Sequence, residues 1–162
     1  MQTANIIIRQ VMLDDFDDFY EIISSNKITD DMQPVVEKQK AKDLLIETLE
    51  LAKQNKKFTF GMILKQNKKL IGFIDLAIKD KLTGELSCVV HPNYWNKGYG
   101  SEAMLEIQNF ALEKMKLKRL CGVCSLFNSS CSSLFKNVLG FEYKKTEQVD
   151  NKDYLYFEKV KK

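Results

Sequence analysis

A short loop containing two glycines carries the clearest chemical signal in the sequence. Lys97-Gly98-Tyr99-Gly100 follows an apolar run that ends at Val90, and an amphipathic stretch with helical spacing begins at Ser101. The first N–H groups of a helix have no partner inside the helix and lie at the positive end of its dipole, so they attract anions. Because glycine has no Cβ, the backbone can approach a phosphate closely. The segment therefore predicts a phosphate-binding loop, in which the Ser101 hydroxyl offers one more donor.

Two other phosphate-binding motifs fit this loop poorly. A Walker A loop needs a lysine before its serine or threonine, and Gly100-Ser101 lacks that lysine. A dinucleotide fingerprint needs Gly-x-Gly-x-x-Gly in an opening β-α-β unit, but the third glycine is replaced by Ala103 and the preceding strands form a meander. On the glycines alone, a tight strand-to-helix turn that binds nothing is the alternative.

Two carboxylates lie in strand-like segments near this loop. Glu85 is on the run that leads into the loop, and Asp75 interrupts the apolar run 71–78. A carboxylate is suited to accept a proton as a general base, directly or through water. An acidic side chain within an apolar strand also needs a partner or a function. Glu85 is the first candidate for a general base and Asp75 the reserve; otherwise Glu85 is simply an exposed residue after a glycine turn.

The cysteines indicate buried, reduced thiols. The chain has four, and their spacing does not suggest a disulfide framework. Cys121-Gly-Val-Cys124 has the C-x-x-C pattern but lies in a strand-like run, where residues three apart point to opposite faces. A zinc site would need a second pair of ligands, and His91 is the only histidine. We therefore expect no metal.

The elements that must position these residues follow from the two apolar periodicities. Helical patterns begin near Asp14, after Pro34, at the glycine loop and at Asn128. Strand-like runs occupy residues 6–9, 58–64, 70–78, 85–90, 120–126, 141–149 and 153–159. The order β-α-α-β-β-β-α-β-α-β-β predicts one mixed α/β domain over residues 1–162, with helices on the faces of its sheet.

Composition and charge argue against a nucleic-acid-binding, membrane-spanning or secreted protein. The net charge of +3 is too small to indicate a nucleic-acid partner. No window of 18 residues is apolar throughout, so we expect no membrane span, and the first 20 residues lack the pattern of a secretory signal. These features predict a cytoplasmic protein. The sequence leaves its oligomeric state open between a monomer and a homodimer.

The segment from Glu85 to Ala103 resembles the acetyl-CoA signature of the GNAT superfamily of N-acetyltransferases. Its nearest pattern is the RimJ/RimL-type branch, which often reads Trp-Gly-Lys-Gly-Tyr-Ala-x-Glu-Ala; here Asn96 replaces the first glycine. Asn128 and the following residues up to Leu139-Gly140-Phe141 resemble the second family element, with a spacing one residue longer. The resemblance implies a GNAT-like fold, with a mostly antiparallel sheet of about six to seven strands flanked by about four helices. It also implies that a primary amine attacks the thioester of acetyl-CoA directly.

The resemblance also implies roles for individual residues. A backbone N–H near Val89 or Val90 would stabilise the oxyanion, Asn128 would bind the pantetheine arm, and Lys136 the 3′-phosphate. Trp95 is expected to pack beneath the loop, with a place in the acceptor cleft as the alternative. The complete set of cofactor-binding candidates is Val89, Val90, Trp95, Asn96, Lys97, Gly98, Tyr99, Gly100, Ser101, Asn128 and Lys136.

A general acid is harder to assign. Many GNAT enzymes have a tyrosine where this chain has Phe135, and a phenyl ring cannot donate a proton. Cys131 and Ser132 are the substitute candidates, unless they only begin a helix, as serine often does. The leaving thiolate resembles that of a cysteine, whose pKa is about 8.5, so an acid helps without being essential.

The acceptor is expected to bind between the first helices, the segment with Asp30 and Asp31, and the final hairpin with Tyr154 and Tyr156. Protein N-terminal α-amines are the first candidates, followed by polyamines, aminoglycosides and other small amines. A non-catalytic acyl-CoA-binding or regulatory module is the alternative, and such a protein would hold CoA but release no thiol. A nucleotide-binding protein would instead bind ATP or NAD through the glycine loop.

Overall fold

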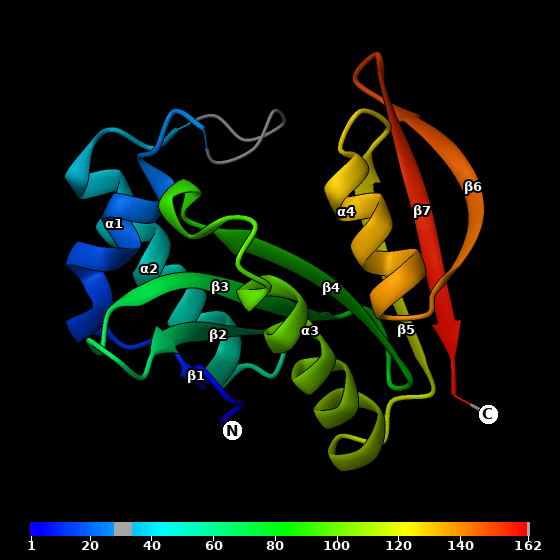
Figure 1. The fold of residues 1–162 in the computed structure, drawn as a ribbon, viewed down its shortest axis with the longest axis horizontal. Coiled ribbons are helices and arrows are strands. Elements are labelled where there is room, and N and C mark those ends of the chain that lie inside the picture. The colour runs from blue at the N-terminus through cyan, green and yellow to red at the C-terminus, as the bar shows by residue number, and fades with distance from the viewer. Residues whose placement is uncertain (28–33, 162) are drawn as a thin grey trace.

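A seven-stranded sheet runs through the protein in the order β1-β2-β3-β4-β5-β7-β6 (Figure 1). The structure is a computed structural model and describes residues 1–27 and 34–161. Neighbouring strands are antiparallel except β4 and β5. The strands are β1 (Ile6–Gln10), β2 (Lys57–Leu64), β3 (Leu70–Ile78), β4 (Thr83–Val90), β5 (Arg119–Ser125), β6 (Glu142–Val149) and β7 (Lys152–Val160). The expected mixed, mostly antiparallel GNAT-like fold is confirmed.

Helices cover both faces of the sheet, which explains why β3 is apolar along most of its length. Helices α1 (Phe16–Ile23) and α2 (Lys38–Lys53) pack on β3 and β2 from one side. Helices α3 (Tyr99–Asn109) and α4 (Ser129–Ser133) lie on the other side (Figure 1). Each side has its own buried apolar cluster. Within the described residues, no helix is long and apolar enough to cross a membrane.

The parallel strands β4 and β5 separate soon after they meet. Their register pairs are limited to Thr83–Arg119, Gly84–Leu120 and Glu85–Cys121. Beyond these pairs β4 continues along β3, whereas β5 continues along β7. We call the resulting gap between the two strands the fork.

Helices α3 and α4 each end in a wide π-turn. The turn after α4, Leu134–Val138 (η4), is closed by the bond from Leu139 N to Leu134 O at 3.0 Å. A π-turn accommodates one additional residue within a helix. It therefore absorbs the extra residue that separates this segment from the family pattern, and Gly140, at φ +67°, ends the helix.

The final hairpin places β7 between β5 and β6. Its turn residues, Asp150 and Asn151, have φ angles of 49° and 61°. Positive φ at both central positions is typical of a type I′ turn, which suits the twist of a hairpin. The expected hairpin at these residues is confirmed, and β6 forms an exposed edge strand.

Candidate active site

The peptide groups of β4 alternate between β3 and the fork. His91 N donates to Ile71 O of β3 at 2.8 Å. Because peptide groups on an antiparallel strand alternate in direction, those of Val90 and Cys88 point away from β3 and into the fork. The N–H of Val89 points toward β3. Val89 and Val90 are the two residues expected to offer an oxyanion donor. Of these, only Val90 has a backbone N–H that points into the fork, and the N–H of Cys88 points there too.

The loop after β4 adopts backbone angles that explain its sequence. Asn96 has φ +58° and Gly98 has φ +80°. Asparagine is among the few residues that adopt this left-handed conformation readily, so it can replace the first glycine of the family pattern. Around Gly98 no atom lies within 4 Å of an ideal Cβ position. The backbone at Gly98 is therefore open, and α3 begins at the next residue.

The first turn of α3 lies directly over the fork side of β4. An ideal Cβ on Gly100 would be 3.4 Å from Val90 Cγ2 and 3.7 Å from Cys88 Sγ. The unpaired N–H groups at the start of α3 thus lie beside the two β4 residues whose peptide groups enter the fork. The partly buried Cys88 thiol is not a nucleophile at neutral pH, because burial and the nearby charge of Asp75 raise its pKa to about 12.

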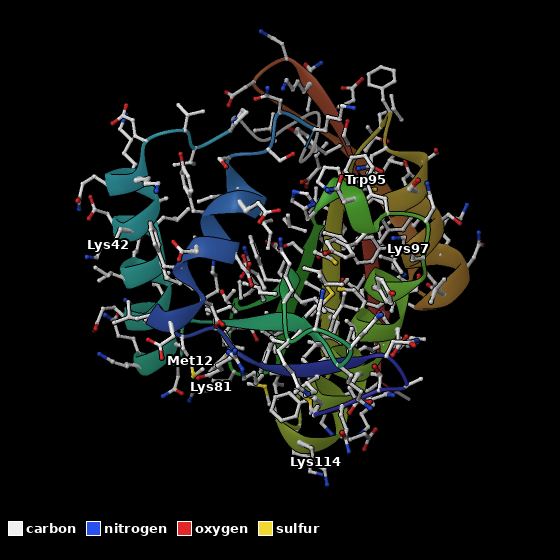
Figure 2. All side chains as sticks on the ribbon, turned by 60° about the vertical axis from the view of Figure 1, so that its left-hand side comes forward. Met12, Lys42, Lys81, Trp95, Lys97 and Lys114 are labelled. Atoms are coloured by element: carbon white, nitrogen blue, oxygen red, sulfur yellow. The ribbon has the colours of Figure 1, made fainter. Side chains whose placement is uncertain are left out.

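Two large side chains of the loop lie at the surface. Trp95 is 44% exposed, and its Nε1–H donates to Val90 O at 2.6 Å. The expectation that Trp95 packs beneath the loop as a core residue is wrong, because this hydrogen bond holds the indole at the mouth of the fork. Lys97 is exposed, with Nζ 5.3 Å from the ring centroid of Tyr94 (Figure 2). The loop therefore presents an aromatic ring and a cation to solvent.

These features fit the phosphates and pantetheine of acetyl-CoA. The loop combines an open glycine, a lysine and a helix N-terminus, which together suit a pyrophosphate. Ser101 lies in the first turn of α3 and Tyr99 is its first residue. Beside them, the N–H groups of Val90 and Cys88 face the fork.

The other border of the fork is the start of α4. Asn128 Oδ1 accepts from Cys131 N at 2.9 Å, and Asn128 O accepts from Ser132 N at 3.0 Å. Asn128 is thus the N-cap of α4, and its side-chain amide N–H2 is not used in that contact. Cys131 and Ser132 are half-buried in the first turn. Lys136 is exposed on η4.

Phe135 is a core residue. Its side chain is 2% exposed, and its ring centroid lies 5.2 Å from that of Phe141 and 5.6 Å from that of Phe157. A residue so enclosed cannot reach a substrate. The ring fills the space between η4 and β5, beside Gly122.

The carboxylates near the fork point to the side of α1 and α2. Glu85 and Val89 share a face of β4, and Val89 belongs to the cluster under α1 and α2. Glu85 Oε2 lies 3.2 Å from Lys79 Nζ. Asp75 accepts from Thr59 Oγ1 and from Lys57 Nζ, the latter at 2.9 Å. Asp75, the reserve base, thus has structural partners.

A hydroxyl and a thiol adjoin Glu85 where the fork begins. Cys121 is the register partner of Glu85, and the Tyr156 hydroxyl is hydrogen-bonded to the Cys121 thiol. Burial raises the pKa of both Cys121 and Tyr156, so both are protonated at neutral pH. The sequence placed Tyr156 in the acceptor region but did not link it to Cys121 or Glu85. Strand alternation alone could not do so, because the register of β4, β5 and β7 was unknown.

None of the four cysteines forms a disulfide. Cys121 and Cys124 lie on opposite faces of β5, as expected, since Cys124 belongs to the cluster under α3 and α4. No group of three or more His, Cys, Asp or Glu side chains in the described chain is arranged to hold a metal ion. Asp30 and Asp31, predicted to adjoin the acceptor, lie outside the described residues.

The fork, the glycine loop and the N-terminus of α3 together form a candidate site for an acyl-CoA. Residues 5–142 match the family model described as "Acetyltransferase (GNAT) domain". The chain therefore belongs to the GNAT acetyltransferase family and is an acetyl-CoA-dependent N-acetyltransferase. Among curated proteins, it is 28% identical to the uncharacterized N-acetyltransferase YnaD of Bacillus subtilis over 138 residues, or 84% of this chain and 79% of that one.

Solved structures share the fold over nearly the whole chain. A GNAT-family acetyltransferase from Bacillus anthracis has a TM-score of 0.87 at 21% identity, covering 99% of this chain and 97% of that one. RimL, a ribosomal α-N-protein acetyltransferase in complex with coenzyme A, has a TM-score of 0.85 at 9% identity, covering 98% and 95%. Spermidine N-acetyltransferase from Vibrio cholerae has a TM-score of 0.80 at 14% identity, covering 98% and 95%.

Proposed function

We propose that this enzyme acetylates a primary amine that reaches the fork from the side of α1 and α2, with protein N-terminal α-amines as the leading acceptors. The observation that carries the proposal is the divergence of β4 from β5 after Glu85. Acetyl-CoA supplies an activated carbonyl and a thiol leaving group. Val90 and Cys88 face the fork between the cofactor loop and Glu85, so the two substrates can meet there from opposite faces of the sheet.

Different residues of the chain would stabilise the oxyanion, bind the cofactor and protonate the leaving group. The N–H groups of Val90 and Cys88 would stabilise negative charge on the carbonyl oxygen. The loop Trp95-Asn96-Lys97-Gly98-Tyr99-Gly100-Ser101 would hold the phosphates, while Asn128 and Lys136 bind the pantetheine and the 3′-phosphate. Cys131 and Ser132 are the proposed proton donors to the departing sulfur. Because Phe135 lies in the core and has no acidic proton, the leaving thiolate would be protonated by Cys131, Ser132 or solvent.

Glu85 is the proposed general base, and this choice favours an α-amine. A polypeptide α-amine has a pKa of about 7.7–8.0, whereas that of a lysine side chain is about 10.4. A carboxylate acting through water is suited to deprotonate the α-amine. Glu85 is also paired with Lys79, an arrangement suited to a charged carboxylate at the entrance.

The charge around the fork also favours a singly charged acceptor. Glu85, Asp75 and Glu158 have basic neighbours, with N–O separations of 3.2, 2.9 and 3.8 Å. A polyamine carries several cations and would need unpaired carboxylates to bind them. Within the described residues this side of the fork offers carboxylates that are already paired. Polyamines and aminoglycosides are therefore the second class of acceptor, although spermidine is the substrate named for one protein of this fold.

The test is a thiol-release assay with acetyl-CoA, comparing peptides with free N-termini, the same peptides N-terminally blocked, spermidine and an aminoglycoside. We expect Glu85→Gln to lower kcat with free peptides by about 10²-fold or more, because positioned bases typically contribute that much. Asp75→Asn tests the reserve base, and Glu142→Gln on the edge strand β6 is the control for loss of one charge.

Other outcomes would point to other proteins. Acetyl-CoA at 100 times its Kd should stabilise the fold by about 2.7 kcal/mol. Such stabilisation without thiol release from any amine would indicate a non-catalytic acyl-CoA-binding module. The cytoplasmic location and the monomeric or homodimeric state remain predictions from the sequence.

A further inference from the structure

The first five residues form a hook on the outer edge of β1. The Met1 α-amine donates to Ile8 O at 2.8 Å, and Ile8 N donates to Met1 O at 2.9 Å. Gln2 forms an isolated antiparallel bridge with Ile7. The hook therefore pairs with a strand that would otherwise be a free sheet edge. We call Met1–Asn5 the N-terminal hook.

The hook ends in a polar contact with α3. Asn5 N donates to Glu102 Oε1 at 2.9 Å, and Asn5 Nδ2 donates to Glu102 Oε2 at 3.0 Å. The Thr3 hydroxyl also hydrogen-bonds this carboxylate. Burial raises the pKa of Glu102, but the bonds from Asn5 and Thr3 outweigh it, so the pKa lies below its ordinary value. The contact thus engages a charged carboxylate through both oxygens.

The hook is itself fixed to the sheet. Lys65 N donates to Asn5 O at 3.0 Å, and Lys65 Nζ donates to Thr3 O. Lys65 directly follows β2, so the hook is connected to two strands. Asn5, which binds Glu102, is therefore held in place by hydrogen bonds to the sheet.

Glu102 lies in the turn that carries the anion site. Its own N–H donates to Gly98 O at 2.9 Å, which closes the first turn of α3. On the core side Ala103 and Ile107 are fully buried. Apolar contacts hold a helix against a sheet but are non-directional, whereas two hydrogen bonds to one carboxylate also define its rotation and its position along its axis.

We propose that Asn5 and Glu102 are positioning residues for acetyl-CoA: the N-terminal hook holds the first turn of α3 in the orientation that aims its N–H groups at the pyrophosphate. Neither side chain needs to touch the cofactor. The proposal rests on the acetyl-CoA site proposed above. It assigns to the N-terminal hook a part in cofactor affinity.

The experiment is a calorimetric titration of acetyl-CoA into the full-length protein, with steady-state kinetics on the same samples. We expect Glu102→Ala and Asn5→Ala each to raise the Kd and KM for acetyl-CoA about tenfold, equivalent to about 1.4 kcal/mol. At saturating acetyl-CoA, kcat should stay within about twofold of the wild type, and the double variant should be no worse than either single one, because both remove the same contact. Glu102→Gln should give an intermediate Kd.

The matched control is Glu106→Gln, which removes the same charge one turn further along α3 and should leave the Kd unchanged. An unchanged Kd in Glu102→Ala and Asn5→Ala would overturn the proposal, as would a lower kcat at an unchanged Kd. If Glu102→Ala does not fold, the Kd values of Glu102→Gln and Asn5→Ala for acetyl-CoA test the proposal by the same criteria. Failure of the wild type to bind acetyl-CoA would instead contradict the proposed function.

Discussion

The ring of Phe135 lies directly on the backbone of Gly122. A Cβ added to Gly122 would lie 2.0 Å from Phe135 Cζ and 2.1 Å from Cε1, far inside contact distance. The absence of a side chain at this point of β5 is what lets α4 and η4 approach the sheet. The same contact encloses the Phe135 ring in the core.

Gly122→Ala should destabilise the protein by about 3 kcal/mol, because overpacking of a filled core forces side chains and backbone to move. Chemical denaturation measures the change in the free energy of unfolding. Gly100→Ala is the comparison, since its Cβ would meet its nearest atom at 3.4 Å. Equal stability of the two variants would contradict the described packing.

Phe135→Tyr should lower both stability and expression of the folded protein without raising kcat. The added hydroxyl would enter an apolar core, at a cost of about 1–3 kcal/mol if it finds no partner. Denaturation and thiol-release rates on the same preparation test both parts. A rise in kcat would show that position 135 reaches the leaving sulfur after all.

Gly98→Ala should weaken acetyl-CoA binding and destabilise the start of α3, because a left-handed conformation costs a residue with a Cβ about 1–2 kcal/mol. The surrounding space is open, so the effect comes from the backbone and not from a clash. Gly98→Asn is the matched variant and should retain most of the affinity, as Asn96 already occupies this conformation at φ +58°. Titration with acetyl-CoA distinguishes the two.

Asn128→Asp should separate the two roles proposed for this residue. Aspartate preserves the oxygen that caps α4, so stability should hold, but it has no amide N–H2 to offer the pantetheine. Asn128→Ala should lose both, with a stability loss of about 1 kcal/mol. We therefore expect weaker acetyl-CoA binding in both variants and a lower melting temperature in the alanine variant alone. Full affinity in Asn128→Asp would remove Asn128 from the cofactor site.

Asp15→Asn should reduce stability in a pH-dependent way. Asp15 accepts from both Arg9 guanidinium nitrogens, at 2.7 and 2.8 Å, and from Met12 N at 2.8 Å. Burial raises the pKa of Asp15, but these bonds outweigh it and lower the pKa below its ordinary value. Its contribution, about 2 kcal/mol for bonds to a charged group, is therefore complete above about pH 4 and disappears as the pH falls through the lowered pKa.

The free energy of unfolding should be measured for the wild type and Asp15→Asn from pH 7 down to pH 3. The difference between the two should be constant down to about pH 4 and become smaller below it. The neighbouring Asp14→Asn is the control, because Asp14 is exposed. A gap that persists unchanged to pH 3 would contradict the ion pair.

Local sequence determined the elements and the cofactor loop. A continuous apolar run predicted β3. The positive φ angles of Asn96, Gly98, Asp150 and Asn151 occur at residues that tolerate them, and helix α3 begins directly after Gly98. These features depend on backbone preferences of a few adjacent residues, so they can be inferred without knowing the rest of the chain.

Tertiary structure alone decided which of these elements meet. The fork needs β5 to follow β4 for only a few residues, and the partners of Asp75 come from β2. Asn5 and Glu102 are 97 residues apart, and nothing near either one predicts the other. The exposure of Trp95 and the burial of Phe135 follow from how α3 and α4 pack on the sheet. Such choices depend on the sum of contacts between distant segments, because each segment buries its apolar face only against the partners that the whole fold supplies.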